Sequence, residues 1–193
     1  MALSREYLAY LAPQLAARLG KSGKVSITNL PAVAGKVQTL IQEDFAKEER
    51  LNQEVRNYLE QYNERIRREG ISYQEMYTMV KKELLKKYSL IPSGGSDREG
   101  GKLSRSKVME LSHLLVKELA RLRPHIEFLQ ESNEVRLEIV RQLQALLKEE
   151  SQIEQAAQQK IRSQKREIEE GSAEWDILFR KYYTEEMRKL GAA

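Results

Sequence analysis

The feature that most constrains the fold is an internal repeat, because the second half of the chain follows the order of motifs in the first. Leu3-Ser4-Arg5 recurs as Leu103-Ser104-Arg105, and Lys47-Glu48-Glu49 recurs as Lys148-Glu149-Glu150. Between these motifs the apolar positions recur as well: Leu8, Leu11, Leu15 and Leu19, then Val108, Leu111, Leu115 and Leu119, with Ile27 and Leu30 matched to Ile126 and Leu129. A shared order over most of each half predicts a duplicated unit.

The duplication divides the chain into two units and a connector. Residues 93–102 contain four glycines and no apolar side chain, which is the composition of a flexible linker. We therefore expect a first helical repeat at 1–92 and a second at 103–193. The sequence does not predict whether the two repeats pack on each other.

Each repeat is predicted to contain three helices. The first helix runs from about Ser4 to Leu19, or from about Ser104 to Arg121, with the serines as N-caps. A short extended piece follows in each repeat, and the two pieces could pair, although neither is long enough to predict a sheet. The third helix opens at Ser72 or Ser172, and Ser72 and Glu75 have capping-box spacing.

The second helix of each repeat is unusually long, because nothing breaks it between Pro31 and Gly70 or between Ser132 and Gly171. At ~1.5 Å per residue it measures roughly 58 Å. A compact chain of this length would have a radius of gyration of only about 16 Å. We therefore expect an all-α, elongated molecule with coiled-coil-like packing, in which the third helix folds back over the far end of the long one.

The composition limits the location and the chemistry. The chain has no cysteine, and its net charge of +4 arises in residues 1–90, which hold 15 Lys and Arg against 11 Asp and Glu. No segment reaches the roughly 18 consecutive apolar residues of a membrane span, and the N-terminus lacks the apolar region of a secretory signal. We therefore expect a cytoplasmic protein with no disulfide and no membrane partner.

Catalytic patterns are missing. Of the only two histidines, His113 is interpreted as a surface or packing residue and His125 as a turn residue. The carboxylates lie on helices that should be exposed, and the glycines match neither a phosphate loop nor a dinucleotide-binding loop. We therefore expect no enzymatic activity, no cofactor and no metal site.

Basic side chains form the first candidate contact for a partner. Arg65, Arg67 and Arg68 would meet Lys81 and Lys82 if the third helix folds back, and this patch would suit an anionic partner. Alternatively, these side chains simply form a solvated helix surface.

The second candidate contact lies near the C-terminus, where Trp175 and Tyr183 accompany Arg180 and Lys181. Aromatic and basic groups together can stack on bases or bind a partner helix. The alternative is that the aromatic residues pack on the long helix, because their spacing is helical.

A tryptophan turn, Gly171-Ser172 followed by Glu174-Trp175, precedes Lys181-Tyr182-Tyr183. With LSRSKVMELSHLLVKEL at 103–119, this segment resembles a bacterial family known only as domain of unknown function 507. The first half is similar to a diverged copy, with Gly70-Ile71-Ser72-Tyr73 in place of that turn. The resemblance implies an all-helical, elongated shape that can be forked, and it implies no activity.

The sequence does not itself reveal what the protein does. Our leading hypothesis is a non-catalytic interaction or scaffolding protein that binds a protein partner through its long helices or their ends. The alternative is binding to RNA, the ribosome or DNA through the basic residues of the first repeat. A homo-oligomer is open as well, because the apolar stripes could pair within one chain or between chains.

Overall fold

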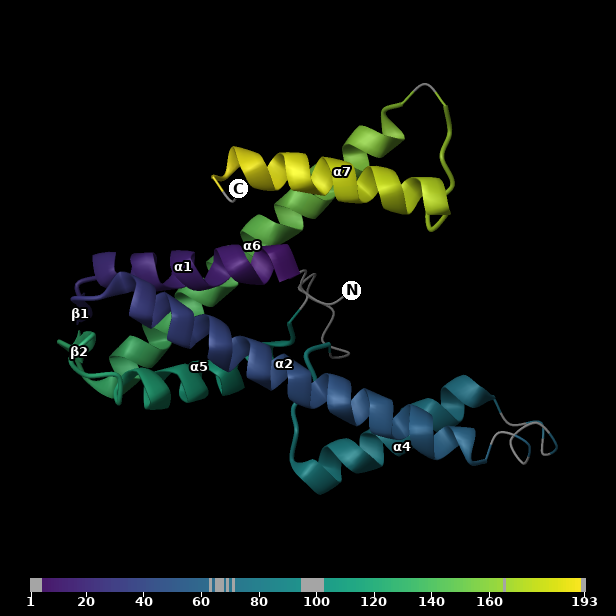
Figure 1. Ribbon diagram of the computed structural model, residues 1–193, viewed down its shortest axis with the longest axis horizontal. Helices are drawn as coiled ribbons and strands as arrows, with labels where there is room; N and C mark the ends of the chain where they lie inside the picture. Colours follow the sequence, from purple (N-terminus) through teal and green to yellow (C-terminus); the bar gives the residue numbers. More distant parts are fainter. Residues whose placement is uncertain are drawn as a thin grey trace.

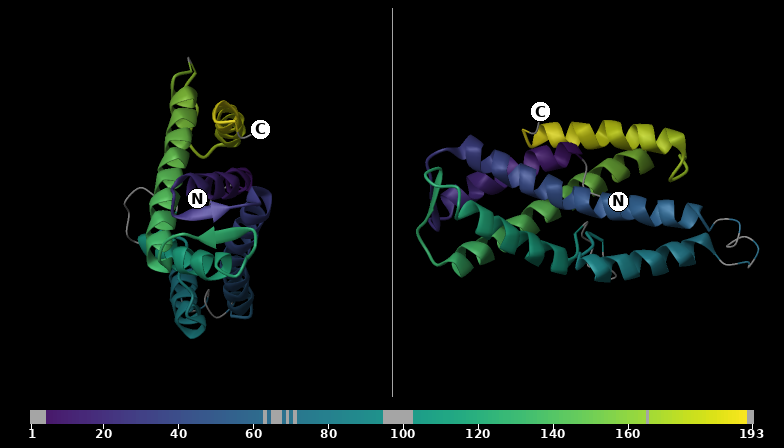
Figure 2. Two further views of the ribbon diagram at one scale, coloured as in Figure 1. Left: turned by 90° about the vertical axis from the view of Figure 1, so that its left-hand side faces the viewer. Right: turned by 60° about the horizontal axis from the view of Figure 1, so that its bottom comes forward.

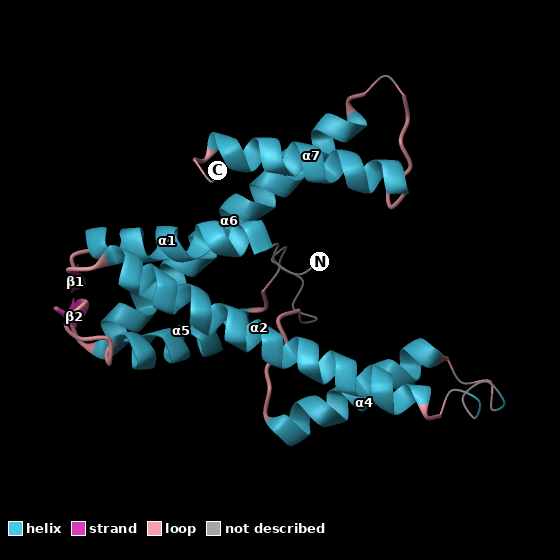
Figure 3. Ribbon diagram, viewed as in Figure 1, coloured by secondary structure: helices cyan, strands magenta, loops and turns pink. Residues whose placement is uncertain are grey.

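The structure, a computed structural model, describes residues 5–62, 64, 68, 70, 72–94, 103–164 and 166–191. These residues form six helices and one two-stranded ribbon (Figures 1 and 3). In chain order they are α1 (Arg5–Lys21), β1 (Val25–Ile27), α2 (Leu30–Glu60), α4 (Tyr73–Tyr88), α5 (Arg105–Leu119), β2 (Ile126–Phe128), α6 (Ser132–Arg162) and α7 (Ala173–Lys189). The predicted helical fold class is confirmed. Both halves share the order helix, strand, long helix, shorter helix, whereas duplication and elongation remain predictions.

Local capping explains where several helices begin. The Ser104 hydroxyl accepts the Lys107 N–H at 3.1 Å, and the Ser172 hydroxyl accepts the Trp175 N–H at 3.1 Å. Both bonds satisfy a donor that the first turn of a helix leaves free. Ser72 is also an N-cap, but its side chain makes no capping bond, so the expected capping box is absent. Ser4 lies outside the described residues.

The long helices are shorter than expected. Each contains 31 residues, and α6 ends at Arg162 instead of reaching Gly171. No proline or glycine marks this end; the Ser163 hydroxyl instead donates to the Lys160 carbonyl at 3.0 Å. Ion pairs then join the turn to neighbouring helices, with Arg162 lying 2.9 Å from Glu170. Six of the twelve residues between α2 and α4 lie outside the described residues.

One hydrophobic core joins the two halves of the chain. The helices α1 and α5 pack with the first parts of α2 and α6, so the halves do pack on each other. Fully buried members come from all four helices: Leu11, Leu15, Val33, Val37, Leu111, Leu115, Val135 and Ile139. Figure 1 shows these four helices gathered at one end of the molecule.

A short antiparallel ribbon closes that end (Figure 2). In its register Val25 pairs with Phe128 and Ile27 pairs with Ile126. Val25 and Ile126 are the buried residues, at 2% and 1% exposure. The two extended pieces therefore pair across the halves, and the match of Ile27 with Ile126 was wrong, because Val25 occupies the position equivalent to Ile126.

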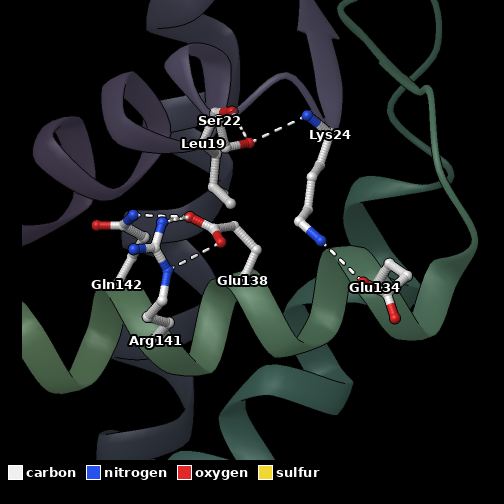
Figure 4. A network of polar contacts seen from close by, with 7 residues as sticks. All are labelled: Leu19, Ser22, Lys24, Glu134, Glu138, Arg141 and Gln142. Carbon is white, nitrogen blue, oxygen red and sulfur yellow. Dashed lines mark hydrogen bonds and ion pairs between the residues drawn. The ribbon is translucent and has the colours of Figure 1, made fainter.

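A polar network fastens the turn after α1 to α6 (Figure 4). Lys24 Nζ lies 2.8 Å from a carboxylate oxygen of Glu134. One turn further, Glu138 is buried and accepts hydrogen bonds from Arg141 at 2.6 Å and from Gln142 at 2.7 Å. The Arg141 hydrogen bond holds the pKa of Glu138 below its usual range. The halves are thus joined by polar as well as apolar contacts.

Two arms leave the four-helix bundle. The first arm consists of α2 from Lys47 onward with α4, and the second arm consists of α6 from Glu149 onward with α7. Figure 1 shows the arms diverging on the side of the bundle away from the ribbon. In each arm the last helix folds back along the long helix, as the sequence predicted.

Candidate interaction surfaces on the two arms

A buried ion cluster lies at the root of the first arm. Lys107 on α5 is 1% exposed, and its Nζ lies 2.5 Å from Asp44 Oδ2 and 2.8 Å from Glu110 Oε2. Asp44 is buried as well, on the neighbouring helix α2. Burial lowers the pKa of Lys107, but the hydrogen bonds and charges of Asp44 and Glu110 outweigh burial and raise it overall. Because a buried charge is stable only when paired, this cluster fixes α5 against α2.

A second polar cluster ties α4 and the connector to the same root. Glu48 accepts the Ser93 N–H at 2.8 Å, and Lys81 on α4 lies 3.3 Å from its other oxygen. Ser93 in turn accepts the Ser104 N–H at 2.7 Å, so the described ends of the connector meet there. Burial raises the pKa of Glu48, but the Ser93 and Lys81 interactions outweigh burial, and the pKa lies below its usual range.

The root of the second arm is held by tyrosines. The Tyr7 hydroxyl on α1 donates to the Leu146 carbonyl on α6, and the Tyr183 hydroxyl on α7 donates to Glu150 at 3.2 Å. Burial, with the nearby carboxylates of Glu150 and Glu149, raises the pKa of Tyr7. These residues occupy the places that Lys107, Asp44, Lys81 and Glu48 hold in the first arm. The buried positions of α2 and α6 differ by 102 residues, so Glu48 corresponds to Glu150 and not, as the sequence motif predicted, to Glu149. The two roots therefore have similar geometry and different chemistry.

The arms also differ in how their helices are packed. The second arm extends the main core, which includes Tyr183 and Met187 of α7. The first arm has a separate cluster built on Leu51, Val55 and Leu59, and no residue of α4 is fully buried. Helix α4 is therefore the less securely packed of the two outer helices.

A shallow pocket of about 250 Å³ opens on the first arm between α2 and the end of α4. Its floor contains Leu51, which is 2% exposed, and Leu90, which packs on the first-arm cluster. Lys47 and Arg50 line it from α2, and neither forms an ion pair with a described residue. The Tyr88 hydroxyl, also at the pocket, donates to Glu54 at 2.9 Å. An apolar floor with unpaired cations suits an apolar side chain that has a neighbouring anion.

The structure places the basic residues predicted in the first repeat in different settings. Arg65 and Arg67 lie outside the described residues, and Arg68 is exposed and 3.6 Å from Glu64. Lys81 is directed to Glu48, at the arm root, whereas Lys82 is exposed. Among the described residues, then, only Arg68 and Lys82 of this set face solvent.

The predicted residues of the second repeat divide in a similar way. Trp175 is 6% exposed, and the guanidinium of Arg162 lies 6.0 Å from its ring centre. Tyr183 is buried beside Glu150. Arg180 and Lys181 are exposed. The aromatic pair therefore belongs to the packing of the arm, and the two cations remain on its surface.

Sequence reasoning missed most of the exposed apolar residues. Ten large apolar or tyrosine side chains are exposed in the described part of the chain, and seven lie on the arms: Tyr58, Tyr62, Tyr73, Met79, Tyr88, Ile177 and Leu190. Met79 and Ile177 lie outside the apolar stripes of α4 and α7, and the sequence alone does not distinguish them from ordinary surface residues. On the first arm the rings of Tyr58 and Tyr62 contact each other, with centres 5.0 Å apart.

The fold and its surfaces define a mostly helical protein with a four-helix bundle and two arms. Within the described ranges, no helix is long and apolar enough to cross a membrane, and no cluster of three or more potential ligands could hold a metal ion.

The chain belongs to the family described as "Protein of unknown function (DUF507)", whose model matches residues 1–192. The match spans both halves of the chain. No curated protein matches the sequence.

Proposed function

We propose that this protein is a non-catalytic interaction protein that binds a protein partner through its arms. The main support is the distribution of exposed large apolar and tyrosine side chains: seven of the ten in the described residues lie on the arms, five of them on the first arm. Large apolar side chains on a surface are typical of binding sites when they gather in one region.

Charge supports a partner that is not strongly basic. Helix α4 contains four lysines and two glutamates, whereas α7 contains four cations and four carboxylates. On the first arm Lys47, Arg50, Lys82 and Lys87 form no ion pair with a described residue. A partner with acidic side chains around an apolar contact would complement this surface.

Cross-linked capture with the tagged full-length chain tests the proposal. We expect a discrete protein that is recovered after nuclease treatment and is lost with the variant Tyr58→Ser/Met79→Ser. The matched control is Leu137→Ser on the bundle, because Leu137 is 46% exposed and Tyr58 is 48% exposed. Capture that is equal for all three chains would contradict a role for the first arm.

RNA binding is the second candidate, and the exposed Tyr58–Tyr62 ring pair favours it. Neighbouring aromatic rings can stack on unpaired bases, and the uncompensated lysines of the first arm could neutralise phosphates. Fluorescence anisotropy with a labelled single-stranded RNA at low and high salt tests this candidate. Binding that weakens with salt and is lost in Tyr58→Ala/Tyr62→Ala would favour it over a protein partner.

A further inference from the structure

The four-helix bundle joins the two halves of the chain through equivalent contacts. Helix α1 of the first half packs on α6 of the second, and α5 of the second half packs on α2 of the first. The buried positions match as well, because Leu11 recurs as Leu111 and Val37 recurs as Ile139. In a symmetric dimer, too, the same patch lies on both sides of the interface. By apolar contacts alone, two first halves from different molecules could therefore pair as a first and a second half do.

Ion pairs between the halves break this equivalence. Arg18 on α1 donates to both carboxylate oxygens of Glu149 on α6, at 2.9 and 2.8 Å. Lys36 on α2 lies 3.5 Å from Glu118 on α5. Both cations belong to the first half and both anions to the second, and the four side chains are between 22% and 34% exposed. Partly buried pairs are screened less by salt than pairs on the open surface.

Two like halves would bring like charges together at these sites. Arg18 is equivalent to Glu118, because the buried positions of α1 and α5 differ by 100 residues. Glu149 is equivalent to Lys47, because those of α2 and α6 differ by 102. Two first halves would thus place Arg18 beside Lys47 and beside Lys36, and two second halves would place Glu118 beside Glu149. Like charges across a contact oppose association.

The buried pair at the root of the first arm has a similar effect. Lys107 of the second half binds Asp44 of the first, whereas the equivalent residues Tyr7 and Leu146 contact each other in the second root. Two second halves would set Lys107 against the uncharged Leu146. Two first halves would set Asp44 against Tyr7, which supplies no cation. A buried charge that loses its partner of opposite sign is strongly unfavourable.

We propose that these charges make the bundle interface selective, so that a first half accepts a second half and rejects a copy of itself. Both elements of specificity are present, since the correct half meets attractive contacts and the wrong half meets repulsive ones. The selectivity keeps copies of the chain from joining through like halves while they fold. It concerns the bundle, and it does not depend on the partner proposed for the arms.

Single substitutions in the full-length chain reproduce the wrong contacts. Arg18→Glu sets two carboxylates against each other, as two second halves would, and Glu149→Lys sets two cations against each other, as two first halves would. Each should lower the equilibrium constant of folding about tenfold in urea unfolding. The double variant Arg18→Glu/Glu149→Lys forms the ion pair in the reverse direction and should recover most of that loss. Single variants that are as stable as the wild type would overturn the inference.

The choice of partner can be measured after the connector is cut. The full-length chain folds first, a protease cuts at a site introduced within residues 95–101, and the complex is then unfolded and refolded. Native mass spectrometry identifies which halves have paired, and the wild type should give mixed complexes of a first and a second half. Arg18→Glu/Glu149→Lys gives both positions the charges of their equivalents, Glu118 and Lys47. Complexes of like halves should therefore appear beside the mixed one in this variant.

The matched control is Lys24→Glu/Glu134→Lys, which reverses another ion pair between the halves (Figure 4). The equivalents of Lys24 and Glu134 are His125 and Ala32, so this reversal does not exchange repulsive for attractive contacts between like halves. The control should give mixed complexes, as the wild type does. Wild-type halves that pair at random, or that no longer find each other, would overturn the inference. So would a double variant Arg18→Glu/Glu149→Lys that forms mixed complexes alone.

Discussion

The Lys107–Asp44 pair permits a quantitative test of the arm root. Lys107→Met removes the cation and leaves the Asp44 carboxylate buried at 4% exposure. Breaking a buried pair by removing one partner costs about 3–5 kcal/mol, because the remaining charge is uncompensated. We therefore expect the free energy of unfolding to fall by about that amount, as measured by urea denaturation followed by circular dichroism at neutral pH.

The second half of the chain suggests the rescue. Leu146 occupies the place of Asp44 on α6, so an apolar side chain is tolerated at the equivalent site of the other arm. In Lys107→Met/Asp44→Leu no buried charge remains at this pair. The decrease in the free energy of unfolding should then shrink to about 1 kcal/mol or vanish, because replacing a buried ion pair by apolar side chains is often neutral or stabilising. The double variant should thus be more stable than Lys107→Met.

The control is an ion pair with greater exposure. Lys24 and Glu134 lie 2.8 Å apart, but their side chains are 29% and 49% exposed, so Lys24→Met should cost less than about 1 kcal/mol. If Lys107→Met costs no more than Lys24→Met, or if the double variant is no more stable than Lys107→Met, the reasoning about the buried pair is refuted.

Three further predictions concern pH, capping and local opening. The pKa of Glu48 is lowered in the folded state, so Glu48 stabilises the fold fully at pH values above its unfolded pKa of about 4.3. That stabilisation is lost as the pH falls through the lower pKa of the folded state. Urea unfolding should accordingly show Glu48→Gln less stable than the wild type at pH 7 and the difference shrinking at pH 3; an equal difference at both would contradict this. Ser172→Ala should cost about 1 kcal/mol by the same assay, and Ser72→Ala clearly less, because only Ser172 makes a capping bond; equal losses would refute the assignment. Hydrogen exchange should be faster for the amides of α4 than for those of α7, since no α4 residue is fully buried; equal protection would count against a separate first-arm cluster.

Much of the fold could be predicted because apolar spacing determines which helix faces are buried. Leu11, Leu15, Leu111 and Leu115 were matched by spacing and occupy the shared core. The ends of the long helices could not be predicted in the same way. The end of α6 depends on the Ser163 cap and on the ion pair of Arg162 with Glu170 in the turn before α7, and neither is visible as a helix breaker.

The arm roots were missed although the sequence contains a signal for them. Lys107 lies four residues before Leu111, on the apolar stripe of its helix, and Asp44 lies three residues after Ile41 on the stripe of another. A cation and an anion at core positions of two helices predict a buried pair, but only once those helices are known to be neighbours. The exposed residues of the arms were harder to find, because a single Ile177 or Met79 outside a stripe is indistinguishable from ordinary surface.

The shared core and ribbon have a consequence for the covalent continuity of the chain. Each strand finds its partner in the other half, and Ser93 and Ser104 are joined by a hydrogen bond at the base of the connector. If the peptide chain were cut between them, the two fragments would still contain surfaces that fit each other. In the uncut chain the connector mainly raises the effective concentration of one half at the other. The protein is thus organised as a split pair, in which two separately synthesised polypeptides should reassemble into one native molecule.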